Sequence, residues 1–161
     1  MTAAQSTPLW DWAVAAYGAP GVSEACVALQ DNHEQNVPVL LWSAWIAATG
    51  RNPDAETIEA ACDTARAWDS VVVAPLRAIR RTLKAPIPDI DDEPRQAVRD
   101  RVKALELLAE RHLLEALEAL ALEAPTGSPR PFVEALVATA RVWAQVTPRP
   151  ALIRLADALP A

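Results

Sequence analysis

The segment from Val37 to Thr49, VPVLLWSAWIAAT, constrains the fold of this chain more than any other stretch. Only Ser43 and Thr49 interrupt its apolar character, so a helix over these residues would be hydrophobic on every side. Such a helix is stable only when other elements surround it. We therefore predict that residues 37–49 form a buried central helix around which the rest of the chain packs.

Length and composition favour one helical domain. The chain has 161 residues, of which 52% are hydrophobic and only 4 are glycine. A chain of this length usually forms one core, and a low glycine content with abundant alanine and leucine favours helices over turns and sheets. We predict an all-α bundle of about seven or eight helices that spans residues 1–161 as a single domain.

Prolines and glycines divide the chain into the expected helices, because proline is tolerated in the first turn of a helix and disrupts its interior. Residues 1–7 are expected to be a flexible N-terminus, 85–94 an acidic proline-rich linker, and 124–161 a C-terminal helical extension. The expected helices cover about 9–17, 22–31, 37–49, 54–83 with an interruption near 70–75, 95–123, 131–146 and 151–159.

The amphipathic helix over about 95–123 is the longest of these. At 1.5 Å per residue it would be over about 40 Å long, so we expect it to project beyond the bundle. A projecting amphipathic helix is a natural surface for a protein partner or for a second copy of the chain.

Charge and hydropathy set the expected environment. The formal net charge of -6 repels phosphate backbones, which disfavours nucleic acid as a partner. The N-terminal residues lack a basic region followed by an apolar one, and no apolar run reaches the ~20 residues of a membrane span. We expect a soluble cytoplasmic protein with no membrane partner. Cys26 and Cys62 lie in apolar helical segments, so we expect free, buried thiols.

Motifs for common chemistries are missing from the sequence. It contains no phosphate-binding glycine loop, no serine nucleophile elbow, no CxxC pair and no HExxH zinc motif. Cys26 and His33 are too far apart to share a metal along one helix, and the acidic run 89–93 lacks the glycine of a calcium loop. We expect no metal and no other cofactor, and we assign no catalytic residue. The sequence does not decide whether the protein is an enzyme, but the missing motifs favour a protein without catalytic activity.

The polar residues before the central helix form the best candidate ligand site. Gln30, Asp31, His33 and Asn36 gather where the free N–H groups and positive dipole end of that helix could receive an anion or an acceptor. Asp31 or His33 could also act in acid–base chemistry. The alternative is structural, with Asn36 and Asp31 capping helix ends and His33 in an exposed loop.

The aromatic residues indicate both core and surface. Trp42 and Trp45 are interpreted as packed core with satisfied indole N–H groups, rather than as an aromatic ligand box. Trp10 and Tyr17 lie on a second face of the first helix, away from the face that carries Leu9. Large aromatic side chains at a surface are typical interface anchors, so Trp10 and Tyr17 are interface candidates.

Four basic residues, Arg77, Arg80, Arg81 and Lys84, recur at helical spacing and are further interface candidates. They form either a face whose charges are solvated or paired within the chain, or a surface that recognises an acidic or phosphorylated partner or RNA.

Three separated segments together resemble a known family: LWDWAVAAYGAPGVSEACVALQDNHEQNVPVLLWSAW, AWDSVVVAPLRAIRRTLK and VKALELLAER. The family consists of short proteobacterial proteins classed as a domain of unknown function. The resemblance covers roughly residues 9–115 and implies a single cytoplasmic domain, but no activity and no catalytic residues. The tail after Glu123 lies outside it.

The sequence supports three hypotheses for the function. The first is a small helical interaction protein, an adaptor or regulator that binds proteins through its surface and can form a homodimer. The second is a small-molecule-binding protein or enzyme with its site at the N-terminus of the helix over 37–49. The third is binding of RNA or a phospho-ligand by the basic residues, which the net charge of -6 disfavours.

Overall fold

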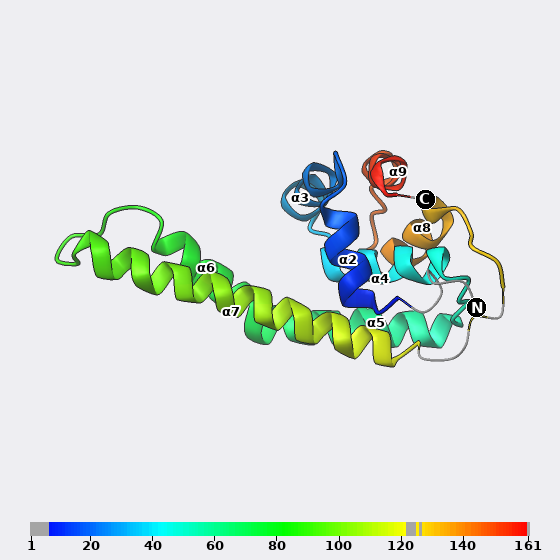
Figure 1. Cartoon of the computed structure of the whole chain (residues 1–161), viewed down its shortest axis with the longest axis horizontal. Helices are drawn as coiled ribbons and strands as arrows, with labels where there is room; N and C mark the ends of the chain where they lie inside the picture. The colour runs from blue at the N-terminus through cyan, green and yellow to red at the C-terminus, as the bar shows by residue number, and fades with distance from the viewer. Residues whose placement is uncertain (1–6, 122–124, 126, 161) are drawn as a thin grey trace.

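The computed structural model describes residues 7–121, 125 and 127–160, and in these ranges the chain is all-α, as predicted. Figure 1 shows a body of short helices and a long arm, formed by α6 and the first part of α7, that extends well beyond the body. The elements in chain order are α2 (Leu9–Tyr17), α3 (Val22–His33), α4 (Val37–Ala48), α5 (Ala55–Trp68), η1 (Asp69–Val73), α6 (Ala74–Thr82), α7 (Asp92–Ala119), α8 (Phe132–Trp143) and α9 (Arg149–Ala158).

The predicted central helix is α4, and every residue from Val39 to Ala47 is buried. Its two sides belong to two groups of buried side chains. Trp42 and Trp45 pack with residues of α2, α5 and α7. Leu40 and Ala44 pack with residues of α3, α8 and α9. Burying one large apolar side chain contributes about 1.5–3 kcal/mol, so the apolar residues of α4 stabilise both groups.

The indole groups of α4 only partly match the prediction. Trp45 Nε1 donates a hydrogen bond of 3.0 Å to the Thr7 carbonyl, and the Arg51 guanidinium lies 4.2 Å from the centroid of the Trp45 ring. The buried Trp42 Nε1 has no acceptor among the described residues. The expectation of a satisfied indole is therefore confirmed for Trp45 and wrong for Trp42, which sits among apolar side chains.

The predicted interruption near residues 70–75 is the π-helical turn η1, which joins α5 directly to α6. In it the Ala74 N–H donates to the Asp69 carbonyl, five residues earlier. Pro75 explains the wider turn, because its ring would clash with the carbonyl of residue 71 in a regular α-helix. Val71, Val72 and Val73 are helical here, although valine is a residue type that favours strands.

The arm is a helical hairpin in which α6 and α7 are joined by residues 83–91 (Figure 1). The buried Arg95 holds its tip, since its guanidinium donates to the carbonyls of Leu83 at 2.6 Å and Lys84 at 3.3 Å. α7 begins at Asp92, three residues before the predicted start, so the expected linker 85–94 is shorter than predicted. Asp92 and Glu93 suit the positive end of a helix dipole, and Pro94 suits a first turn.

The C-terminal helices are part of the body. α8 packs along α4, and its Thr139 hydroxyl contacts Ser43 in the interior. The Arg130 N–H donates to the Ala47 carbonyl at 2.9 Å, which ties the segment before α8 to the end of α4. Of the expected flexible N-terminus, residues 1–7, only Thr7 falls within the described residues. Within the described ranges, no helix combines the length and apolar character needed to cross a membrane.

Candidate functional site

The N-terminal end of α4 is capped by its own neighbours. Asn36 Oδ1 accepts a hydrogen bond of 3.0 Å from the Val39 N–H, as the structural interpretation of this residue predicts. The buried Gln35 donates from Nε2 to the His33 carbonyl at 3.3 Å. Glu34 ends α3 in the left-handed conformation, with φ of 53°. The side chain of Asn36 therefore caps the N-terminus of α4.

The other predicted polar residues face different parts of the surface. Gln30 lines a pocket that also includes residues of α2, α4 and α7. Asp31 and His33 are exposed and border an open depression together with Arg66 and Trp143. Gln30 thus lines one cavity, whereas Asp31 and His33 line another. The structure brings Gln30 together with a different set of residues.

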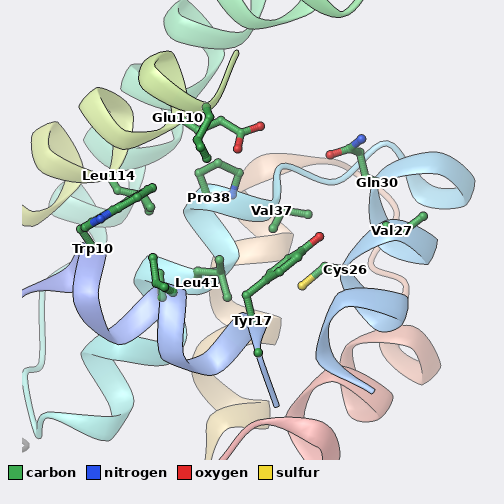
Figure 2. Close-up of a pocket in the computed structure, with 14 residues that line it drawn as sticks. Trp10, Tyr17, Cys26, Val27, Gln30, Val37, Pro38, Leu41, Glu110 and Leu114 are labelled. Carbon is green, nitrogen blue, oxygen red and sulfur yellow. The ribbon is translucent and has the colours of Figure 1, made fainter. Parts of the chain in front are cut away.

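The pocket lined by Gln30 has a volume of about 460 Å³ and lies between α2, α3, the start of α4 and the middle of α7. Trp10 and Tyr17, the two aromatic interface candidates, line it as well. Figure 2 shows Trp10 at one side, Tyr17 across the middle, Glu110 at the top above Pro38, and Gln30 at the side opposite Trp10. The second face of α2 thus becomes one wall of this pocket, which we call the α2–α7 pocket.

Glu110 is the lining residue that the sequence analysis missed. It follows Leu107 by three residues and precedes Leu114 by four, and both leucines line the same pocket. Residues at these spacings share one face of a helix. A carboxylate between two leucines on one helix face is the sequence signal that indicates Glu110.

The environment of Glu110 shifts the pKa of its carboxyl group. Burial raises the pKa of the Glu110 carboxyl above its ordinary value, and the nearby Glu106 raises it further. Arg77 and Arg80 of α6 act in the opposite direction but do not outweigh burial. Glu110 is therefore a carboxyl group in the lining of an apolar pocket, and Arg77 and Arg80 of α6 are the cations that act on it.

Two further titratable groups line the pocket. Burial raises the pKa of the Tyr17 hydroxyl, with smaller contributions from Cys26 and Glu110. Burial also raises the pKa of the Cys26 thiol to about 12. Cys26 and Cys62 are both free and buried, as predicted. A thiol with so high a pKa is a weak nucleophile at neutral pH, because the thiolate is the reactive form.

The predicted basic residues of α6 divide between ion pairs and solvent. Arg80 Nε lies 2.6 Å from a carboxylate oxygen of Glu106, and this carboxylate is largely buried. Arg77 faces the pocket acid described above. Arg81 and Lys84, toward the tip of the arm, are exposed. The interpretation that these positive charges are compensated within the chain therefore applies to Arg77 and Arg80.

The arm also carries a row of exposed apolar side chains. A shallow groove of about 420 Å³ runs along α7 beside the end of α5, η1 and α6, and Leu76 is among its lining residues. The sequence predicted one apolar stripe on the long helix. Although α5, η1 and α6 all pack against α7, part of that stripe stays exposed among the described residues. We define the arm stripe as Val71 (74% exposed), Ile79 (48%), Val98 (52%), Leu105 (50%) and Leu108 (49%).

Fold and sites together define a small all-α protein with a helical arm and an apolar pocket at the base of that arm. The described residues contain no group of three or more histidine, cysteine, aspartate or glutamate side chains arranged to hold a metal ion. The chain belongs to the family described as protein of unknown function (DUF2390), whose model matches residues 8–117. This match confirms the resemblance to a family of unknown function. No curated protein and no solved structure matches the chain.

Proposed function

We propose that this protein is a helical interaction protein, and that the arm stripe is its binding surface for a second copy of the same chain. The observation that carries the proposal is that five large apolar side chains of η1, α6 and α7 are each 48–74% exposed, and that three of them, Val71, Leu105 and Leu108, line one groove. Contiguous exposed apolar surface of this kind marks protein interaction sites more often than free surface.

The shape of the arm favours a second copy as the partner. Two helices side by side bury one apolar side each against the other and leave a second side exposed. Two such arms placed face to face about a twofold axis form a four-helix bundle, in which both stripes become core. Both copies use the same arm stripe, so the interface requires no other surface of the chain.

The dimensions of the arm set the area that such a dimer would bury. Its free part is about 25 Å long, since it includes about 17 residues of α7, and about 20 Å wide, the width of two helices. Pairing would cover a flat area of roughly 500 Å² on each copy, which approaches the ~800 Å² of accessible surface per partner found in specific interfaces once side-chain relief is included.

Light scattering coupled to size-exclusion chromatography tests this proposal. The wild type is expected to elute with the mass of a dimer, and the double variant L105E/L108E with that of a monomer, because two buried charges would be forced against the apposed stripe. Circular dichroism checks that the variant is folded.

Val146 provides the matched control, because it is 78% exposed and lies outside the arm, between α8 and α9. The V146E variant should keep the dimeric mass. A monomeric wild type at high micromolar concentration would overturn the proposal, as would a dimer that survives L105E/L108E.

The hypothesis of RNA or phospho-ligand binding has less support. Of its four basic residues, Arg80 is paired with Glu106 and Arg77 faces Glu110, which leaves Arg81 and Lys84 as exposed cations on a chain of net charge -6. Two exposed cations are a weak footprint for a phosphate backbone.

A further inference from the structure

The α2–α7 pocket has the size and position of a small-molecule site, separate from the arm stripe. Its volume of about 460 Å³ lies within the range of ~300–1,000 Å³ that is usual for ligand pockets. It draws on four different helices, of which α2, α3 and α4 belong to the body and α7 connects the body to the arm.

The walls of the pocket are apolar and partly open to solvent. Val14, Tyr17, Val27 and Leu107 line it with exposed fractions of 54%, 42%, 49% and 57%. They come from three helices and meet around one opening, so their exposure is not scattered over the surface. A ligand that covers them removes apolar area from water, which contributes roughly 25 cal/mol per Å².

Polar groups lie toward one end of the pocket. Figure 2 shows the Glu110 carboxyl and the Gln30 amide directed into the same region, with the Tyr17 hydroxyl on the side nearer to Cys26. Glu110 and Gln30 also share the lining of a small adjoining space at the start of α4. These groups can accept hydrogen bonds from a ligand, and Gln30 can also donate one.

The charge of the lining selects between ligand types. Among the residues described as lining the pocket, the titratable ones are Glu110, Tyr17 and Cys26, and none is lysine, arginine or histidine. Each of the three is neutral or negative, never positive. An anionic head group would find no cation on this wall, whereas an ammonium group would find a carboxylate and an aromatic ring.

From this geometry we propose that the α2–α7 pocket binds an organic amine with an apolar body. The ammonium group pairs with the Glu110 carboxylate beside Gln30, and the apolar body lies along Tyr17 and Leu41 toward Trp10. The groups that act on Glu110 from neighbouring elements are Arg77 and Arg80 of α6 and Glu106 of α7. Arg80 is paired with Glu106, so Arg77 is the main competitor of the ligand for the carboxylate.

Three probes with the same chain and different head groups test the proposal: octylamine, octanol and octanoate. In isothermal titration calorimetry at pH 8, with the wild-type protein, octylamine should bind most tightly and octanoate least. The variant E110Q keeps the shape of the side chain and removes the charge. It should weaken octylamine binding about tenfold, as expected for a charge-assisted hydrogen bond, and leave octanol binding unchanged.

Two further variants separate binding in the pocket from general effects. Val14 is 54% exposed, so the variant V14W should fold normally. Its larger side chain fills the opening of the pocket and should weaken the binding of both octylamine and octanol. D31N removes an exposed carboxylate next to Gln30 that lies outside the pocket lining, and it should change neither.

The proposal is overturned if octanoate binds as tightly as octylamine, if E110Q weakens octanol as much as octylamine, or if octylamine gives no binding heat at millimolar concentration. None of these outcomes depends on the arm stripe, because L105E/L108E leaves every lining residue of the pocket intact. Failure of the dimer proposal and failure of the amine proposal are therefore distinguishable.

Discussion

The Thr139 hydroxyl donates a hydrogen bond of 2.9 Å to Ser43 Oγ, and both side chains are buried. This contact joins α8 to the middle of α4, at the polar residue that interrupts the apolar run of the central helix. The match to the family model ends at residue 117, before α8 begins. A helix outside the matched region thus completes the burial of α4.

The first prediction concerns this pair. S43A and T139V should each lower the free energy of unfolding by about 1–3 kcal/mol, because each leaves a buried hydroxyl without its partner. The double variant S43A/T139V should lose less than the sum, since no unpaired hydroxyl remains. Urea unfolding of the four proteins gives the coupling energy from a double-mutant cycle. Strict additivity would mean that the contact contributes nothing.

The second prediction concerns Gly50, which follows the central helix with φ of 72°. A Cβ at this position would lie 2.1 Å from the Gly127 carbonyl oxygen, so G50A must displace the segment before α8 as well as strain the backbone. A loss of about 2–4 kcal/mol is expected in urea unfolding. The control is G18A, where φ is -78° and the nearest atom lies at 3.5 Å. G18A should change stability by less than ~1 kcal/mol, and equal losses for both variants would contradict the prediction.

A third prediction follows from the buried thiols. Burial raises the pKa of Cys62 to about 11 and that of Cys26 to about 12. In the folded protein at pH 8, thiol reagents should therefore react about a hundredfold or more slowly than in urea, where a cysteine has a pKa of about 8.5. Single variants C26A and C62A assign the signal to each thiol. Fast labelling of the native protein would show that the thiols are not held neutral.

The same shifts determine a pH dependence of stability. Each thiol has a folded-state pKa above its unfolded value of about 8.5, so the folded protein holds these protons longer. The contribution is complete below about pH 8.5 and is lost as the pH rises toward 11. Relative to wild type, C62A should therefore lose less stability between pH 8.5 and 10.5. Parallel curves for the two proteins would contradict this.

The fourth prediction concerns Glu110, whose pKa is raised above its ordinary value of 4.5, mainly by burial. The folded state binds this proton more tightly than the unfolded state, so the stabilising contribution is complete below pH 4.5 and is lost as the pH rises through the folded-state pKa. E110Q has no proton to lose, and its stability should rise relative to wild type as the pH increases from 4.5 to 7. Thermal unfolding across this range measures the difference, and a constant difference would contradict it.

Ligand binding should show the opposite trend at the same group. An ammonium ligand needs the Glu110 carboxylate, so octylamine affinity should fall as the pH is lowered through the folded-state pKa, while octanol affinity stays constant. Titrations at pH 8 and pH 5 compare the two probes, and a common pH dependence would argue against Glu110 as the ligand partner.

The sequence was sufficient to predict the central helix because α4 has no polar side that could face solvent. Asn36 was likewise predictable as a cap, since its place before an apolar helix and Pro38 fits a known local pattern. Local patterns of this kind involve residues within one or two turns of each other. They do not depend on how distant helices pack.

The pocket was not predictable in the same way. Gln30, Trp10 and Tyr17 were each singled out, but as members of two unrelated groups, and Glu110 was missed. Their meeting depends on α7 crossing both α2 and the start of α4, a contact between segments more than 65 residues apart. Neither helical spacing nor composition contains that information. Asp31 and His33, one and three residues after Gln30, border a different depression together with Arg66 and Trp143.

The continuity of α7 gives the molecule a mechanical property. From Leu114, beside the pocket, to Asp92, near the tip, the helix runs unbroken over about 33 Å. Because the helix is this long, a tilt of about 5° at Leu114 would move the tip by about 3 Å. A rotation of α7 too small to disturb the packing of the body would therefore displace residues 83–91 by a full atomic diameter.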